Sequence, residues 1–347
     1  MIDLRSDTQT RPSQAMREAM AHAEVGDEQE REDPTVLELE RRVADLLGHE
    51  EAVYLPTATM ANEIALVILG ERGTELIVEE AAHIMTAELG GAALHAGLQT
   101  RGVPGHLGRI SPEQIRATTH AGTSFHVPRT SLVAVENTHN NAGGIVWPLE
   151  ELQAVVATAR ELALKLHLDG ARLLNASVAS GVSPRELAKD FDTVSLCLSK
   201  GLGCPLGALV AGSGELMVTA RRFKHLFGGA MRQAGIVAAA GVYAFEHNIE
   251  RLADDHERAR RLAEGLDAAG VPVDLEQVET NFVQVDVGPL GLSPKEALAR
   301  LSEHGVGLSM TAHRTRLRAV THLDVHDEDI ERAVELIPRA LGALARA

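Results

Sequence analysis

The chain has 347 residues, and its 33 Lys and Arg against 49 Asp and Glu give it a formal net charge of −16. This length predicts one large domain with a smaller one, and the acidity argues against a general attraction to nucleic acid or anionic membranes. Because no segment approaches an apolar membrane span and the first residues lack an apolar signal-peptide core, we expect a soluble, cytoplasmic protein.

The first two thirds of the chain alternate between helical and strand-like patterns. Apolar residues recur at a helical period over residues 34–47, and Gly48 follows as a stop signal. Helices are also expected over residues 60–69 and 149–161. Short apolar runs that predict strands cover residues 52–55, 75–78, 130–135, 164–168, 193–198 and 208–211. This alternation predicts an α/β fold with a mostly parallel central sheet flanked by helices.

The last third of the chain has a different pattern. Residues 249–269 predict one long, charged amphipathic helix that ends at Gly270. Strands are expected over residues 282–287 and 318–320, and a closing helix over residues 329–346. We therefore expect a large domain over residues 1–248, which includes an N-terminal arm, and a smaller C-terminal α+β domain over residues 249–347.

Two charged residues, Asp169 and Lys200, lie directly after apolar runs. In a parallel sheet, ligands gather at the carboxyl ends of the strands, where both residues would lie. A lysine amine in such a place is costly to bury without a covalent or paired role, and Schiff-base formation is the usual one. A buried aspartate would keep a pyridine nitrogen protonated, so the pair predicts a pyridoxal phosphate enzyme.

Further polar residues suit the same cofactor. Residues 56–62 predict a turn into a helix, whose free N–H groups and dipole favour a phosphate, and Thr59 could add a hydroxyl. The alternative for this turn is a simple helix cap. His83 follows a strand and His126 precedes one. Either histidine could exchange protons near neutral pH, although a lone histidine is more often structural.

Arginines are expected to hold the carboxylate of an amino-acid substrate, because a planar guanidinium can bind two oxygens at once. Arg172 and Arg318 are the candidates, with Arg316 as a rival to Arg318. No Cys-x-x-Cys or His-Glu-x-x-His motif occurs, so we expect no transition-metal site. Cys197 and Cys204 lie in apolar sequence, which predicts packed thiols and not a disulfide.

As a set, the motifs resemble those of the low-specificity L-threonine aldolases, pyridoxal phosphate enzymes of the aspartate-aminotransferase-like fold (fold type I). The resemblance extends over nearly the whole chain. The segments that carry it are residues 4–8, 26–27, 32–35, 57–62, 82–84, 136–139, 168–172, 199–202, 228–233 and 320–325.

The resemblance implies a role for each matching residue. Lys200 would form the Schiff base, and Lys200, His83 and His126 would be catalytic, with a water between the histidines as a further candidate base. The carboxylate would be held by Ser6, Arg172 and Arg318. The cofactor would be bound by Ala58, Thr59, His83, Asp169, Arg172, Ser199, Lys200 and Arg232. Arg232 would reach the cofactor phosphate of a neighbouring subunit, so we expect at least a dimer, and a tetramer of paired dimers.

The implied reaction cleaves L-threonine, L-allo-threonine or related L-3-hydroxy amino acids to glycine and an aldehyde. Other reactions on the same fold remain alternatives, namely β-elimination, transamination and racemisation, as does a non-catalytic protein that binds the cofactor. The chain departs from its relatives at Ala58 and Arg31, where glycine is common, and at Glu30, where tyrosine is common. Glu30 could favour a cationic or polar substrate substituent, or it could be a solvated loop charge.

Overall fold

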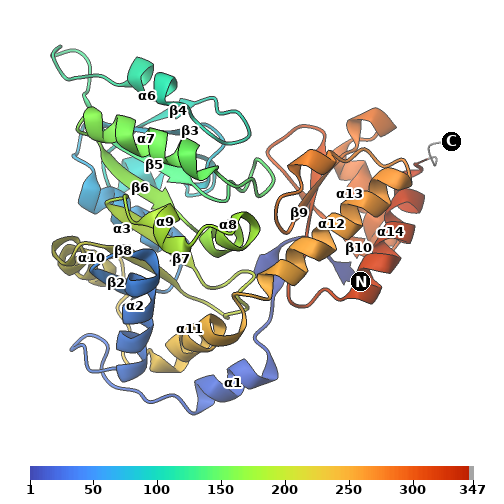
Figure 1. The fold of residues 1–347 in the computed structure, drawn as a ribbon, viewed down its shortest axis with the longest axis horizontal. Coiled ribbons are helices and arrows are strands. Elements are labelled where there is room, and N and C mark those ends of the chain that lie inside the picture. The colour runs from blue at the N-terminus through green and yellow to red at the C-terminus, as the bar shows by residue number, and fades with distance from the viewer. Residues whose placement is uncertain (344–347) are drawn as a thin grey trace.

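A seven-stranded sheet forms the centre of the larger lobe in the computed structural model, which describes residues 1–343 (Figure 1). The strands lie in the order β2 (Glu51–Leu55), β8 (Ala208–Gly212), β7 (Thr193–Cys197), β6 (Lys165–Asp169), β5 (Thr130–Glu136), β3 (Glu75–Glu79) and β4 (Gln99–Val103). All neighbours are parallel except at β8, which runs antiparallel to β2 and β7. The predicted α/β fold is confirmed, and each of the six predicted strands is present within one residue at each end.

The apolar side chains of the sheet divide between two layers of helices, because alternate residues of a strand point to opposite faces. Tyr54 and Leu209 belong to one cluster, and Val53 and Val210 belong to another. The first layer contains α2 (Pro34–Leu47), α7 (Leu149–Glu161), α8 (Leu173–Ser180), α9 (Pro184–Ala188) and α11 (Gly235–His247). The second layer contains α3 (Ala58–Leu69) and α10 (Gly214–Leu226).

The two ends of helix α2 are set by its capping residues, Asp33 and Gly48. The Asp33 carboxylate accepts a hydrogen bond from the Val36 N–H at 3.0 Å and caps the first turn. Gly48 closes the helix with φ of 76°, a left-handed conformation that glycine adopts without strain. The remaining helices of this lobe are short: α1 (Gln14–Ala21), α4 (His83–Thr86), α5 (Gly91–Leu94) and α6 (Pro112–Thr118).

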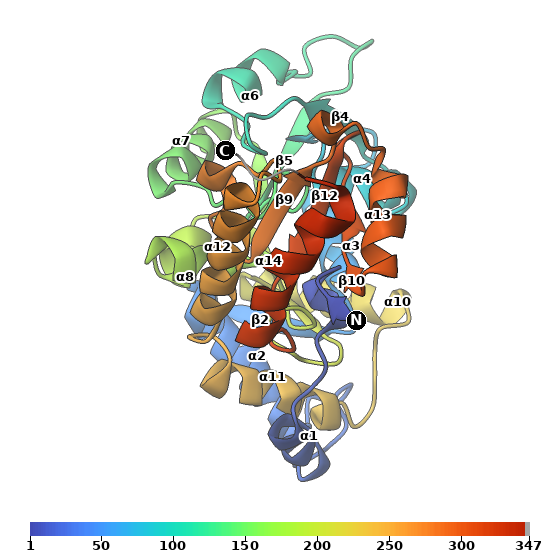
Figure 2. The ribbon, with the colours of Figure 1, turned by 90° about the vertical axis from the view of Figure 1, so that its right-hand side faces the viewer.

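The smaller lobe has its own apolar cluster, which includes residues from both ends of the chain. Strand β1 (Ile2–Asp3) pairs with β10 (Val306–Gly307), so the N-terminal arm lies on this lobe (Figure 2). A second sheet has the order β11 (Ser309–Met310), β12 (Arg316–Val320) and β9 (Phe282–Asp286), and it is antiparallel. The helices are α12 (Leu252–Ala268), α13 (Pro294–Glu303) and α14 (Asp327–Leu341).

Two features of this lobe differ from the sequence prediction. The long helix begins at Leu252 and not at residue 249, and the closing helix ends at Leu341. Residues 344–346 of the predicted closing helix lie outside the described residues. The domain boundary near residue 249 stays a prediction.

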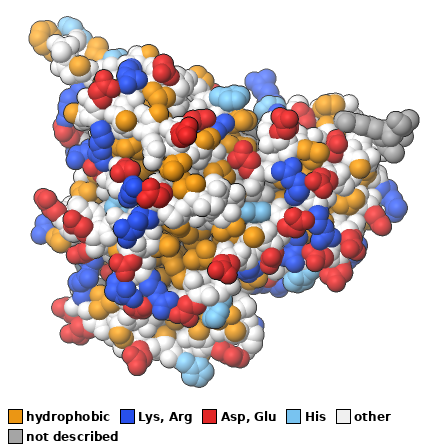
Figure 3. Space-filling view, in the orientation of Figure 1, with side chains coloured by type: hydrophobic (Ala, Val, Ile, Leu, Met, Phe, Trp, Pro, Cys, Tyr) orange, Lys and Arg blue, Asp and Glu red, His pale blue; other side chains and the backbone are white. Residues whose placement is uncertain are grey.

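On the face of the molecule shown in Figure 3, acidic and basic side chains are interspersed over both lobes. Within residues 1–343, none of the helices has the length and apolar character needed to cross a membrane. Cys197 and Cys204 are both free and buried, which confirms the prediction of packed thiols.

Candidate active site

A cavity of about 180 Å³ lies at the carboxyl end of β6 and takes residues from both lobes. Because parallel strands end at the same edge of a sheet, the strand ends deliver several polar side chains to one place. Seven of the residues predicted from the sequence line this cavity: Ser6, Ala58, His83, Asp169, Arg172, Lys200 and Arg318. Their roles in the reaction stay predictions.

Asp169, the last residue of β6, is 2% exposed. Its Oδ2 accepts a hydrogen bond from Asn62 Nδ2 at 2.8 Å, and its Oδ1 accepts one from the Ala171 N–H at 3.1 Å. Burial alone would raise the pKa of Asp169, but the positive charges of His83 and Lys200 hold it below its usual value. The carboxylate therefore stays ionised, as a partner for a protonated pyridine nitrogen must.

Lys200 lies in the loop between β7 and β8, three residues after the buried end of β7. Within residues 1–343, its Nζ forms no hydrogen bond or ion pair. Its charge nevertheless lowers the pKa of two buried carboxyl groups, those of Asp7 and Asp169. The cavity thus contains an amine that is held near two carboxylates and is free to form a covalent bond.

The N-terminus of α3 reaches the cavity through Ala58. Thr57 caps this helix, because its Oγ1 accepts a hydrogen bond from the Met60 N–H at 3.2 Å. In the described part of the chain, the backbone N–H groups of Ala58 and Thr59 donate to no other group, so they remain available to an anion. The Thr59 side chain is exposed and does not line the cavity.

Two arginines, Arg172 from the larger lobe and Arg318 from the smaller lobe, converge at the cavity. Arg172 forms a bidentate ion pair with Asp7, with its Nε and Nη2 each 2.7 Å from a carboxylate oxygen. Although burial raises the pKa of Asp7, this pair lowers it far below the usual range. Arg318 donates from Nη1 to Asn140 Oδ1 at 2.8 Å. The guanidinium carbons of Arg172 and Arg318 lie 4.8 and 5.3 Å from the ring centre of Phe282.

Burial and the neighbouring Arg172 lower the pKa of Arg318 to about 10, which leaves it protonated at neutral pH. Arg316, the rival candidate, is directed elsewhere: its Nη1 donates to Gln284 Oε1 at 3.1 Å, and it lines a different cavity. The structure therefore brings Arg318, and not Arg316, to the cavity that contains Lys200.

His83 opens α4 and is fixed by two acidic residues. Its Nδ1 lies 2.7 Å from Glu88 Oε1, and its backbone N–H donates to Glu136 Oε2 at 2.6 Å. The hydrogen bond with Glu88 raises the pKa of His83 despite partial burial. Asn62 Nδ2 also donates to Glu88 Oε1, at 2.8 Å, so one amide links Glu88 to Asp169.

The side chains of His83, Glu88 and Asp169 could also be considered as metal ligands. Ligand atoms of His83, Glu88 and Asp169 lie within 4.8 Å of one another, as in a metal site. Asn62 already donates to one oxygen of each carboxylate, and Glu88 Oε1 also lies at His83 Nδ1, so we assign no metal to the group.

Besides Thr59, three further predicted residues lie on exposed or neighbouring segments outside the cavity. His126 is exposed in a loop, where its ring lies 5.4 Å from that of the exposed Phe125. Arg232 is exposed and donates to Asp27 Oδ2 at 2.9 Å. Ser199 precedes Lys200 but does not line the cavity. The structure of one chain therefore does not bring these side chains to Lys200.

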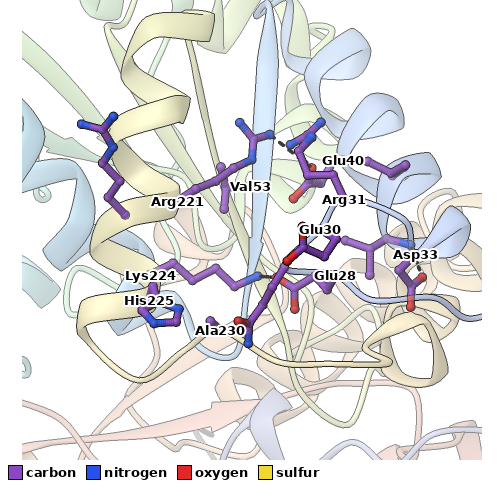
Figure 4. A pocket seen from close by; sticks show the side chains of 14 residues that line it. Glu28, Glu30, Arg31, Asp33, Glu40, Val53, Arg221, Lys224, His225 and Ala230 are labelled. Carbon is purple, nitrogen blue, oxygen red and sulfur yellow. Dashed lines mark hydrogen bonds and ion pairs between the residues drawn. The ribbon is translucent and has the colours of Figure 1, made fainter.

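Glu30 and Arg31 line a second cavity of about 370 Å³ (Figure 4). Arg31 has φ of 59°, in the left-handed region that favours glycine. Its Nη1 lies 3.6 Å from Glu40 Oε2. In the same cavity, Lys224 forms an ion pair with Glu28. Glu30 of the same chain is thus not part of the wall around Lys200.

Sequence reasoning assigned no role to five residues that build the site: Asp7, Asn62, Glu88, Glu136 and Asn140. A usable signal existed for Asn62, which is a polar residue in the otherwise apolar run of α3. Glu88 gives a weaker signal, namely that it lies just after the short helix that begins with His83.

Comparisons with known proteins identify the family and the fold of the chain. A profile of the family described as "Beta-eliminating lyase" matches residues 3–288. The chain is 43% identical over 331 residues to the low specificity L-threonine aldolase of Escherichia coli (strain K12), with 95% of this chain and 96% of that protein covered. Among solved structures, Leishmania major threonine aldolase matches with a TM-score of 0.84 at 21% identity, over 98% of this chain and 100% of that chain. A double mutant of Thermus thermophilus aspartate aminotransferase matches with a TM-score of 0.73 at 18% identity, over 98% of this chain and 91% of that chain. The solved structures support the α/β fold type I.

Proposed function

Because this chain belongs to the Beta-eliminating lyase family, and within it to the low-specificity L-threonine aldolases, we propose that it cleaves L-threonine, L-allo-threonine and related L-3-hydroxy amino acids to glycine and an aldehyde. The observation that carries the proposal is a single cavity lined by Lys200, Asp169 and Arg318. These residues supply an amine, a buried carboxylate and a carboxylate-binding guanidinium.

Pyridoxal phosphate fits this set of donors. The free N–H groups at the start of α3 suit its phosphate, the ionised Asp169 suits its pyridine nitrogen, and Lys200 Nζ suits its aldehyde carbon. When bound, this cofactor would accept the electron pair of the broken Cα–Cβ bond.

The arginines determine how the substrate is oriented. Nε and Nη2 of Arg172 are engaged by the Asp7 carboxylate. Within residues 1–343, Arg318 forms no ion pair and donates only to uncharged oxygens, so its charge is left for a substrate carboxylate, and Ser6 adds a hydroxyl on the cavity wall. Fixing the carboxylate selects which bond of Cα is aligned for cleavage. Asn140 Oδ1 accepts from both arginines, at 3.4 and 2.8 Å, and holds them side by side.

His83 is the histidine on the cavity wall, and we assign to it the removal of the proton from the substrate β-hydroxyl. Glu88 occupies its Nδ1 side at 2.7 Å, so Nε2 is the nitrogen available to the substrate or to a bridging water. A part for His126 requires either movement of its loop or contact with a second chain, since it is exposed outside this cavity.

Arg318→Ala is expected to raise the KM for L-threonine roughly 10- to 100-fold, because a charge-assisted hydrogen bond is worth about 1.5–3 kcal/mol. Arg316→Ala is the matched control, since Arg316 lies on the same strand but binds Gln284 instead. Its KM should stay within about twofold of wild type. Steady-state kinetics of both variants make the comparison, and an equal or larger effect of Arg316→Ala would contradict the assignment.

We further propose a homo-oligomer in the cytoplasm. Arg232 lies outside the cavity of its own chain, which suits contact with the cofactor phosphate of a neighbouring subunit. The active form would then be at least a dimer, and we expect dimers to pair into tetramers. Two free, buried thiols suit a reducing compartment.

Product analysis tests the proposed function. Purified protein with pyridoxal phosphate should convert L-threonine, L-allo-threonine and phenylserine to glycine and one equivalent of aldehyde. A keto acid with ammonia would instead support β-elimination, and bound cofactor without any turnover would support a non-catalytic protein. A preference for substrates with basic substituents that is lost in Glu30→Gln would give Glu30 a part in recognition.

A further inference from the structure

Behind His83 lie two buried carboxyl groups, those of Glu63 on α3 and Glu88 after α4. Each residue is 5% exposed. In the described part of the chain, both oxygens of Glu63 and the Oε2 atom of Glu88 have no hydrogen-bond partner. Buried, unpaired carboxylates are costly, so an arrangement of this kind favours a bound proton over two negative charges.

Glu63 has little freedom to move away from this position. Its carboxyl group lies against the backbone of Gly91, where an added Cβ would lie 1.7 Å from Glu63 Oε1. Burial and the negative charge of Glu88 raise the pKa of Glu63 to about 7, and burial also raises the pKa of Glu88. The two carboxyl groups therefore titrate as an interacting pair, and the pair retains a proton near neutral pH.

Glu88 connects this pair to His83. Its Oε1 lies 2.7 Å from His83 Nδ1 and accepts from Asn62 Nδ2 at 2.8 Å. Asp169 and Glu136 are the other acidic groups whose charges act on His83. A carboxylate at Nδ1 keeps that nitrogen protonated, which leaves Nε2 as the proton acceptor facing the cavity.

We propose that Glu63 holds the proton of a buried acid pair with Glu88, and that this pair sets the protonation of His83. Both glutamates are positioning residues, and the inference rests on the proposed aldol cleavage. While Glu63 is neutral, Glu88 remains the carboxylate that pairs with His83. When Glu63 ionises, a second negative charge makes His83 hold its proton to higher pH, so at a given pH less of His83 is in the free-base form that can accept the substrate proton.

The pH profile of kcat/KM for L-threonine tests this link. Glu63→Gln places a neutral side chain at this position at every pH, so no second negative charge acts on His83. The acidic limb of the profile should therefore move to lower pH by about half a unit or more. Glu88→Gln should lower kcat by about 10- to 100-fold, because His83 loses the carboxylate that orients it. Glu40→Gln is the matched control: Glu40 is also buried with a raised pKa, but it accepts a hydrogen bond from the Tyr54 N–H and is not among the charges that act on His83, so its profile should match wild type.

A second readout does not depend on activity. Infrared difference spectra of the cofactor-free protein should show a protonated carboxyl group that titrates near pH 7, retained in Glu40→Gln and lost in Glu63→Gln. In Glu88→Gln the same band should titrate at lower pH, because the neighbouring negative charge is gone. This variant tests the pair even if Glu63→Gln does not fold.

The outcomes separate the two proposals. An unchanged pH profile in Glu63→Gln, or an infrared band that neither glutamate substitution alters, would overturn the acid pair while leaving the aldolase intact. Absence of aldehyde release from the wild type would refute the proposed function, and the infrared titration would still decide whether Glu63 holds the proton.

Discussion

Lys200→Ala is expected to reduce the release of aldehyde from L-threonine at least about 10³-fold, because no other lysine lines the cavity within residues 1–343. The variant loses the amine that positions the cofactor and keeps the remaining wall. Turnover is measured by aldehyde formation in purified protein with excess pyridoxal phosphate, and unchanged circular dichroism would confirm that the fold is retained.

The matched control for this substitution is Lys295→Ala, which removes an exposed amine from α13. Its turnover should equal that of wild type, since it lies outside the cavity. If Lys200→Ala retained near-wild-type activity, the covalent role of this residue would be wrong.

Asp169→Asn is expected to lower kcat by about 10²- to 10⁴-fold and to weaken cofactor binding. The substitution preserves size and an acceptor for the Ala171 N–H but removes a buried negative charge. Without that charge, a bound pyridine nitrogen would lose its proton and with it the ability to attract electrons. Steady-state kinetics and equilibrium titration with pyridoxal phosphate measure the two effects separately.

Asp190→Asn removes an exposed carboxylate that precedes β7 and serves as the control, with no change expected in either quantity. Equal cofactor affinity and turnover in Asp169→Asn and wild type would show that the carboxylate does not act on the ring.

The central sheet could be predicted because its strands are buried runs bounded by breaks in the pattern. Strands β3, β5, β7 and β8 are buried at every residue, which produces mostly apolar sequence. Strand β4 was missed because four of its five residues are not buried, so its sequence has no apolar run. The pairing of β1 with β10 joins opposite ends of the chain, and no local pattern indicates it.

The candidate site likewise has residues that the sequence could predict and residues that it could not. Asp169 and Lys200 could be placed together because each follows a buried strand. Arg316 and Arg318 could not be separated by sequence, because residues two apart on a strand share a face. Their positions along β12 determine which arginine reaches the cavity. Arg318 lies opposite Gln284 of β9, whereas Arg316 lies opposite Asp286, two residues further along that strand.

The acid pair behind His83 was also beyond sequence reasoning. Glu63 lies among buried apolar residues of α3, yet one charged residue in a helix is ordinarily placed on a solvated face. Its burial depends on the approach of the Gly91 backbone from a distant segment. The role predicted for Arg232 depends on a second chain, and that of His126 depends on a second chain or on movement of its loop, so both stay predictions.

The bond that breaks can be followed with L-threonine that carries deuterium at Cα. Cleavage of Cα–Cβ leaves the Cα–deuterium bond intact, so we expect the first turnovers to yield acetaldehyde and singly deuterated glycine in equal amounts. Loss of the deuterium to solvent with formation of a keto acid and ammonia, or without any glycine, would contradict the assignment of this chain as an L-threonine aldolase.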